Sequence, residues 1–201
     1  MKIILIGANG KIGELVQKAL AGAGHEIVKV GHKSGDFFRV EIENRESVRK
    51  LYQAVGSFDA VAIAAGEVAF APLSELTAEK WQFSLGSKLM GQINLVQEAI
   101  PFISERGSFT LVSGILNDDP IFAGAAASTV SGALEAFVRA AAIELPKGLR
   151  INVVSPTMLK ESESQFAQFF IGMIPVEGWK VGQAYKRAIL GAQTGRVYKV
   201  D

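Results

Sequence analysis

The stretch Ile3-Ile4-Leu5-Ile6-Gly7-Ala8-Asn9-Gly10-Lys11-Ile12-Gly13 decides the fold of this 201-residue chain. Ile3–Ile6 is a short, wholly apolar run, which is typical of a strand that is buried on both faces of a parallel sheet. Apolar residues then recur at helical spacing from Ile12 to Leu20. The loop Gly7–Gly13, in which every third residue is glycine, therefore connects a strand to a helix.

A glycine loop in this position predicts a site for phosphate groups. The first glycine permits a tight turn, a later one lets the backbone approach a phosphate, and the last lets the helix pack closely against the strand. Free amide groups and the dipole at the start of the helix attract the anion. The loop predicts a dinucleotide site with contacts from Gly7, Asn9, Gly10, Lys11, Ile12 and Gly13. The alternative is a tight glycine turn without a ligand.

The residues after the second predicted strand indicate which dinucleotide is bound. An acidic residue about 20 positions beyond the glycines would bind the ribose hydroxyls of NAD. Here the chain reads Gly31-His32-Lys33-Ser34, and Asp36 is the first acid. Lys33, together with His32, can neutralise a 2′-phosphate, so NADP is favoured, with Ser34 as a further contact and NAD as the lesser alternative. An exposed loop lysine without a ligand is the other interpretation.

Apolar runs of strand length alternate with helical segments along the whole chain. The predicted strands are Ile3–Ile6, Ile27–Val30, Phe38–Ile42, Ala60–Ala64, Phe109–Val112, Ile151–Val154 and Arg196–Val200. The predicted helices are Ile12–Leu20, Glu46–Val55, Ala78–Ile103, Ala125–Leu145 and Lys180–Leu190, with a short apolar helix before the last. Repeated strand–helix units with short connections predict a doubly wound parallel α/β sheet of about seven strands, a Rossmann fold, with helices on both faces. Without a linker or repeat, residues 1–201 are expected to form one domain.

Composition excludes several classes of protein. The chain has 49% apolar residues, 21 Lys+Arg against 20 Asp+Glu, a net charge of +1 and no cysteine. These values exclude disorder, a disulfide framework and metal ligation or catalysis by thiolates. No apolar run approaches the roughly 18 residues of a membrane helix, and the N-terminal apolar run is too short for a signal peptide. Near-neutral charge gives no reason to expect nucleic acid as a partner. We expect a cytoplasmic protein with no membrane partner and no metal.

Several ordered landmarks resemble those of the short-chain dehydrogenase/reductase (SDR) family, over nearly the full chain. Besides the glycine loop they are Ala64-Ala65-Gly66, where members usually carry Asn-Ala-Gly, Trp81 through Gly91, Ser113, Ala133–Arg139 and Ile151–Pro156. The resemblance implies hydride transfer between NAD(P) and an alcohol or carbonyl. It also implies cofactor contacts from Ala64, Ala65, Gly66, Pro156 and Thr157, and a homodimer or homotetramer.

The chain departs from the family at the catalytic residues. The family uses a Tyr-x-x-x-Lys pair on the fifth helix, a Ser on the fifth strand and an Asn on the fourth helix. When the family motif is registered on Ala133–Arg139, Ala127 stands at the Tyr position and Ser131 at the Lys position. Lys88 stands where the Asn is usual, and Ser113 alone keeps the family's residue. An alanine cannot donate a proton, and a positioned general acid contributes about 10²–10⁴-fold to a rate.

Lys88 and Ser113 are the predicted catalytic residues. By the resemblance, Lys88 points toward the pocket behind Ser113, where partial desolvation would lower its pKa and let it act as a proton donor or anion clamp. The alternative is a structural lysine whose ammonium bonds to backbone carbonyls near Ser113. Ser113 could likewise be a turn-capping serine before Gly114. The segment Thr157–Ile174 would form an apolar substrate lid, and the remaining tyrosines, Tyr52, Tyr185 and Tyr198, lie in elements that do not map near the site.

Three functions are compatible with these features. The first is an NADP-dependent oxidoreductase with unusual proton chemistry, acting on a small molecule. The second is a non-catalytic NADP(H)-binding sensor or regulatory protein, and the third, more remote, is an isomerase or lyase on the same fold. The glycine loop supports the first two equally. The missing Tyr and Lys favour the sensor, whereas Lys88 with Ser113 favours the oxidoreductase. The oxidoreductase is the leading prediction because the fold resembles that of the family.

Overall fold

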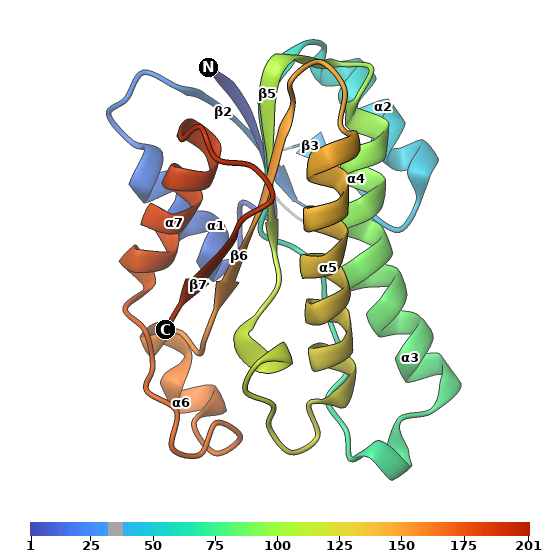
Figure 1. The fold of residues 1–201 in the computed structure, drawn as a ribbon, viewed down its shortest axis with the longest axis vertical. Coiled ribbons are helices and arrows are strands. Elements are labelled where there is room, and N and C mark those ends of the chain that lie inside the picture. Colours follow the sequence, from blue (N-terminus) through green and yellow to red (C-terminus); the bar gives the residue numbers. More distant parts are fainter. Residues whose placement is uncertain (32–37) are drawn as a thin grey trace.

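A computed structural model describes residues 1–31 and 38–201, apart from the side chains of Gln165 and Phe166. Within this part of the chain a parallel sheet has the strand order β3-β2-β1-β4-β5-β6-β7 (Figure 1). Its strands are β1 (Lys2–Ile6), β2 (Glu26–Gly31), β3 (Phe38–Arg39), β4 (Phe58–Ile63), β5 (Ile103–Val112), β6 (Arg150–Pro156) and β7 (Val197–Val200). The predicted doubly wound α/β fold is confirmed.

Helices cover both faces of the sheet (Figure 1). One face carries α1 (Lys11–Leu20) and α7 (Gly178–Leu190), and the other carries α2 (Arg45–Val55), α4 (Gly91–Ala99) and α5 (Ala125–Glu144). The remaining helices are α3 (Ala78–Ser84), the π-helix η2 (Leu85–Met90), α6 (Glu163–Phe166) and the 3₁₀ turns η1 (Leu73–Glu75), η3 (Ile115–Asn117) and η4 (Lys160–Ser162). None of the helices in the described ranges is long and apolar enough to cross a membrane.

Two hydrophobic cores account for the unbroken apolar runs of the strands. Ile4 and Ile6 belong to the core under α2, α4 and α5, whereas Ile3 and Leu5 belong to the core under α1 and α7. Because successive side chains of a strand point to opposite faces, a central strand covered by helices on both sides needs apolar residues at every position. The unbroken apolar run Ile3–Ile6 therefore reflects a sheet that helices cover on both faces.

The third predicted strand, Phe38–Ile42, is wrong in its length. Only Phe38–Arg39 pair with β2, and the chain then leaves the sheet. Asn44 explains this departure, because its side chain accepts hydrogen bonds from the amides of Glu46 and Ser47 and so begins α2. The N-cap directs residues 40–44 across the end of the sheet instead of along it.

The predicted helix Ala78–Ile103 is also corrected. The structure divides it into α3, the π-helix η2 and α4, which ends at Ala99 before Pro101. Ile103 already belongs to β5, which therefore begins earlier than the predicted Phe109. Proline cannot continue a helix, and an insertion of one residue into the helical ladder produces a π-turn. Neither the π-helix nor the early start of β5 follows from apolar periodicity.

Replacing Glu98 with Gln is expected to lower the free energy of unfolding by about 1–3 kcal/mol at pH 7. Glu98 is buried on α4 and accepts hydrogen bonds from Arg45 at 2.7 Å and Arg49 at 3.0 Å. Burial alone would raise the pKa of the Glu98 carboxyl, but the hydrogen bonds from both arginines outweigh it and lower that pKa. The stabilisation is present above the unfolded pKa of about 4.3 and is lost as pH falls through the folded value. Urea unfolding at several pH values should therefore show the wild type and E98Q converging in acid.

Candidate functional site

The glycine loop is held tightly against the ends of β1, β4 and α1. Gly7 has a φ of +80°, and a Cβ atom there would lie 2.3 Å from the carbonyl oxygen of Ala64. A Cβ atom on Gly13 would lie 2.2 Å from the carbonyl oxygen of Gly7. At Gly10, by contrast, the nearest atom would be 3.5 Å away, which is an ordinary contact. Gly7 and Gly13 are thus required by the fold, whereas Gly10 has room for a Cβ atom.

The start of α1 leaves backbone amides available. Gly10 is the N-cap residue, and within the described chain no side chain caps this end of the helix. Amides of the first helical turn have no partner within the helix, so such an end binds anions. The side chain of Lys11 turns away, because its ammonium donates to the carbonyl of Glu161 at 3.2 Å and to the Ser162 hydroxyl at 2.9 Å. The backbone of the loop, more than the Lys11 side chain, is suited to hold a diphosphate.

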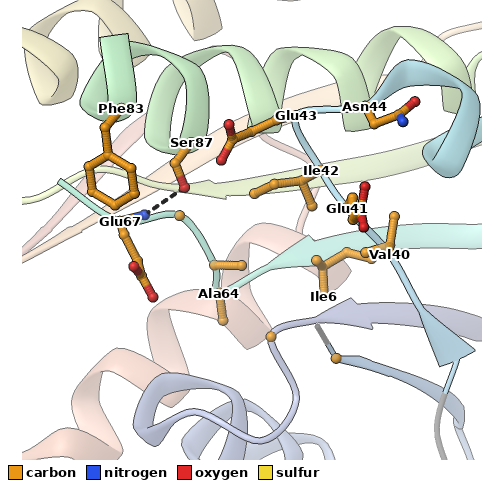
Figure 2. A pocket seen from close by; sticks show the side chains of 14 residues that line it. Ile6, Val40, Glu41, Ile42, Glu43, Asn44, Ala64, Glu67, Phe83 and Ser87 are labelled. Carbon is orange, nitrogen blue, oxygen red and sulfur yellow. Dashed lines mark hydrogen bonds between the residues drawn. The ribbon is translucent and has the colours of Figure 1, made fainter. Parts of the chain in front are cut away.

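A cavity of about 700 Å³ opens beside the glycine loop (Figure 2). Four predicted residues line it, namely Gly7, Ala64, Ala65 and Gly66. The sequence analysis missed its other lining residues, which are Ile6, Gly31, Val40, Glu41, Ile42, Glu43, Asn44, Glu67, Phe83 and Ser87. Open α/β sheets bind ligands at the carboxyl ends of their strands where the strand order reverses, and β1 and β4 form that point here. The cavity and the bare start of α1 together fit a dinucleotide.

Three carboxylates, those of Glu41, Glu43 and Glu67, line the cavity, and its described lining contains no lysine or arginine. In Figure 2, Glu41 and Glu43 lie on the segment after β3, while Phe83 and Ser87 approach from the opposite helix. The Ser87 hydroxyl accepts a hydrogen bond from the amide of Glu67 at 3.1 Å. A 2′-phosphate would therefore need cations from elsewhere in the chain.

The residues predicted to distinguish NADP from NAD are not placed. His32, Lys33, Ser34 and Asp36 lie outside the described residues. Gly31, which directly precedes them, lines the cavity.

Ser113 lies directly after β5 and is buried. Its amide donates to Val154 at 3.0 Å, and its hydroxyl donates to the Glu135 carboxylate at 3.2 Å. Asn117 donates to the other oxygen of that carboxylate, also at 3.2 Å. Glu135 itself is only 3% exposed. The sequence analysis missed Glu135, although it follows Ser131 by four residues and Ala127 by eight and so shares their face of α5.

Ala127 is surrounded by apolar side chains. It is buried with Ile115 and Leu116 in a cluster against which Phe170 and Met173 of the predicted lid pack. Ser131 is also buried on the same helix. At the position that the resemblance assigns to the family's proton donor, the structure therefore has a methyl group in apolar surroundings.

Lys88 lies in the π-helix η2. Its carbonyl accepts a hydrogen bond from the Gln92 amide, which also bonds to both backbone groups of Val112. Since Val112 precedes Ser113, this glutamine ties the Lys88 backbone to the end of β5. The side chain runs along Gly66, where a Cβ atom would lie 3.0 Å from Cδ of Lys88.

Burial lowers the pKa of Lys88 to about 8. Its ammonium has no recorded hydrogen-bond partner in the two described ranges, so the backbone bonds of the structural alternative are not found there. Neither Lys88 nor Ser113 lines the cavity, although Gly66 and Ser87, which are next to Lys88, do. A lysine with a lowered pKa close to a cavity is a candidate for proton transfer.

The tyrosines of the chain are committed to structural hydrogen bonds. Tyr52 donates to the carbonyl of Leu95 at 2.9 Å, and Tyr185 donates to that of Ile63 at 2.6 Å. Burial raises the pKa of both hydroxyls. Tyr198 donates to Gln193 at 2.8 Å. No tyrosine hydroxyl therefore replaces the one missing at position 127.

The other predicted contacts lie at the end of β6 and beyond. Pro156 ends β6, and the Thr157 amide donates to Val200 at 3.0 Å. Neither residue lines the cavity. Of the apolar residues in the predicted lid, Phe170 and Met173 pack inward, whereas Phe169, Ile171 and Ile174 are exposed. The side chain of Phe166 lies outside the described atoms.

Comparison with known proteins gives the class to which this fold and site belong. A family model described as enoyl-(acyl carrier protein) reductase matches residues 9–179. The chain belongs to the short-chain dehydrogenase/reductase family, whose members bind a nicotinamide cofactor. In the described residues, no group of His, Asp or Glu side chains could hold a metal ion.

Relatives and solved structures agree with this assignment. An uncharacterized oxidoreductase of Methylorubrum extorquens is 28% identical over 76% of this chain and 71% of its own length. A short-chain dehydrogenase/reductase of Stachybotrys chlorohalonatus is 27% identical over 77% of this chain and 72% of its own. The protein lin1944 of Listeria innocua is 46% identical, with a TM-score of 0.97 and full coverage of both chains. A small-chain dehydrogenase in complex with NADPH is 21% identical, with a TM-score of 0.86 over 100% of this chain and 96% of its own, and shows the fold.

Proposed function

We propose that this chain is an NADP(H)-dependent oxidoreductase that transfers hydride between its cofactor and a small carbonyl or alcohol through an atypical active site. The observation that carries the proposal is the cradle formed by Gly7 and Gly13, where a Cβ atom would meet backbone at 2.3 Å and 2.2 Å, beside a cavity of about 700 Å³. The NADPH complex of a protein with the same fold supports the choice of cofactor.

Each part of the site has a role in this proposal. The loop Gly7–Gly13 would hold the diphosphate, Ala64–Gly66 would line the cofactor's path, and Pro156 with Thr157 would face the nicotinamide. NADPH, when bound, supplies a hydride. Ser113 would orient the substrate oxygen, and Lys88 would give a proton to it or stabilise its negative charge, because a buried lysine with a pKa of about 8 is still mostly protonated at pH 7.

Two measurements test the proposal. NADPH binding is followed by cofactor fluorescence, and a panel of quinones, aldehydes and ketones is then screened for NADPH consumption. Binding together with turnover of at least one carbonyl is the expected result. A protein that binds neither NADPH nor NADH contradicts the proposal.

A non-catalytic NADP(H)-binding sensor is the second candidate. It is favoured by Ala127, a methyl group buried among apolar side chains at the position of the family's proton donor. Tight NADPH binding without turnover of any carbonyl would decide for this function.

Lys33→Ala is expected to weaken NADPH binding about tenfold or more while changing NADH binding little, because only NADPH carries the 2′-phosphate. The three carboxylates of the cavity make this cation more important, since they repel the phosphate. Fluorescence titrations with both cofactors measure the difference, and Lys18→Ala on the exposed surface of α1 is the matched control. Equal losses of affinity for NADPH and NADH would show that Lys33 does not contact the 2′-phosphate.

We also propose that the chain is a cytoplasmic homodimer or homotetramer built from one nucleotide-binding domain. Exposed apolar side chains on the outer helices, such as Met90 and Ile143, are compatible with contact between copies. Light scattering in solution gives the number of subunits.

A further inference from the structure

A buried carboxylate lies directly behind Ser113. Glu135, on α5, accepts one hydrogen bond from the Ser113 hydroxyl and one from the Asn117 amide, each at 3.2 Å. No lysine or arginine among residues 1–31 and 38–201 forms an ion pair with it. Burying a carboxylate is costly unless hydrogen bonds compensate, and here both donors are neutral. Such an arrangement is unusual for a purely structural glutamate.

The hydrogen bond to Glu135 fixes the direction of the Ser113 hydroxyl group. A serine has one O–H hydrogen and two lone pairs, and the hydrogen is already donated to Glu135. Ser113 therefore presents lone pairs to a substrate. An alcohol can donate its O–H to these lone pairs, whereas a carbonyl oxygen, being an acceptor, cannot bond to them.

Glu135 is the carboxylate among the positions of α5 that are four residues apart. Ala127 and Ser131, which precede it at that spacing, carry no charge, and Arg139, four residues after it, is exposed. From β7, the ammonium of Lys199 pairs with Asp118 at 3.0 Å. Asp118 is the main cause of the raised pKa of Lys199, and Glu135 contributes a smaller part. Lys199 is thus paired with Asp118, and the two side chains that donate hydrogen bonds to Glu135 are the neutral Ser113 and Asn117.

We propose that Ser113 and Glu135 form a proton-accepting pair for alcohol oxidation, with Glu135 as a positioning residue that acts through Ser113. This inference rests on the proposed oxidoreductase function. It specifies an alcohol as the substrate that binds while the Ser113 hydroxyl is hydrogen-bonded to Glu135. The substrate hydroxyl gives its proton to Ser113 Oγ, and Ser113 gives its own proton to Glu135 Oε1. The carbon that carried the hydroxyl loses a hydride to NADP⁺, which leaves a carbonyl product.

Glu135→Gln tests the pair with little disturbance of the fold. The two side chains have the same shape, and Asn117 Oδ1 is buried without a hydrogen-bond partner in the described structure. Asn117 can therefore turn its amide and accept a hydrogen bond from the new NH₂ group. The expected result is a loss of kcat of about 10²-fold or more in NADP⁺-dependent oxidation of 1-phenylethanol or cyclohexanol, with NADPH affinity within about twofold of the wild type. Glu144→Gln, at the exposed end of the same helix, should change neither.

Chemical rescue separates proton transfer from structural support. Glu135→Ala removes the carboxylate and leaves space, so added formate should restore alcohol oxidation in proportion to its concentration. Formate should not restore E135Q, whose amide fills the space. If E135Q does not fold, Glu135→Asp replaces it in the experiment. The shorter aspartate keeps the negative charge but moves it away from Ser113. The kcat for alcohol oxidation should again fall, while NADPH still binds.

The outcomes distinguish this inference from the function on which it rests. Unchanged alcohol oxidation by folded E135Q overturns the inference, as does a wild type that binds NADPH, reduces carbonyls and oxidises none of the alcohols. A wild type that does not bind NADPH overturns both proposals.

Discussion

Gly13→Ala is expected to weaken NADPH binding at least about 100-fold and to lower the free energy of unfolding by about 1–3 kcal/mol. The added Cβ would lie 2.2 Å from the carbonyl oxygen of Gly7 and 2.8 Å from Cα of Ala8. Both are backbone atoms, so no side chain can rotate away, and α1 must shift from the loop. The shift carries the first-turn amides of α1 away from the diphosphate. Urea unfolding and fluorescence titration measure the two effects.

Gly10→Ala is the matched control for this prediction. Its Cβ would lie 3.5 Å from the same carbonyl oxygen, and Gly10 has an ordinary φ of −85°. The free energy of unfolding should therefore change by less than about 1 kcal/mol, which is the scale of an N-cap substitution. NADPH binding should still weaken, because the methyl group occupies the open side of the loop. A stable G13A variant would contradict the close packing of α1, and unchanged NADPH affinity in G10A would place the diphosphate elsewhere.

The sheet could be predicted because its signals are local. The apolar run Ile3–Ile6 has no polar position, and only a strand covered on both faces requires that pattern. The glycine loop that follows is likewise read from contiguous residues. The segment Phe38–Ile42 was predicted wrongly because alternation continues past the last paired residue, whereas the cap at Asn44 draws the chain out of the sheet. Half of the missed cavity lining, residues 40–44, lies in the segment that leaves the sheet.

The catalytic region could be predicted only in part, because its decisive contacts join distant residues. Ser113 and Lys88 are predicted catalytic residues through the resemblance, and the Lys88 backbone does lie beside the end of β5. Glu135 was missed because its partner, Ser113, is 22 residues away and meets it only when α5 packs over the sheet. The π-helix that carries Lys88 was also missed, since its apolar spacing resembles that of an ordinary helix. Both the Ser113–Glu135 contact and the π-helix arise from tertiary packing, which no sequence motif encodes.

Lys88→Met is expected to lower kcat for NADPH-dependent carbonyl reduction by about 10²–10⁴-fold. The methionine side chain has a similar length and can occupy the same path along Gly66, so the fold should persist. Burial sets the pKa of Lys88 to about 8, and the side chain donates a proton only in its charged form. The wild-type rate should therefore fall as pH rises through about 8, whereas the residual rate of K88M should not follow that pKa. Lys18→Met, on the exposed surface of α1, should retain the wild-type profile.

The stability of K88M distinguishes a functional lysine from a structural one. The folded pKa of about 8 lies below the unfolded value of about 10.4, so between these pH values the unfolded chain binds more protons. The free energy of unfolding of the wild type should consequently rise from pH 8 to pH 10, and K88M should lack that rise. Because methionine removes a partly buried charge, K88M should be more stable than the wild type by about 1–3 kcal/mol at pH 7, with the difference shrinking as pH rises. Lower kcat with higher stability is the combination expected of a residue kept for function. Lower stability with unchanged turnover would instead assign Lys88 to the structure of η2.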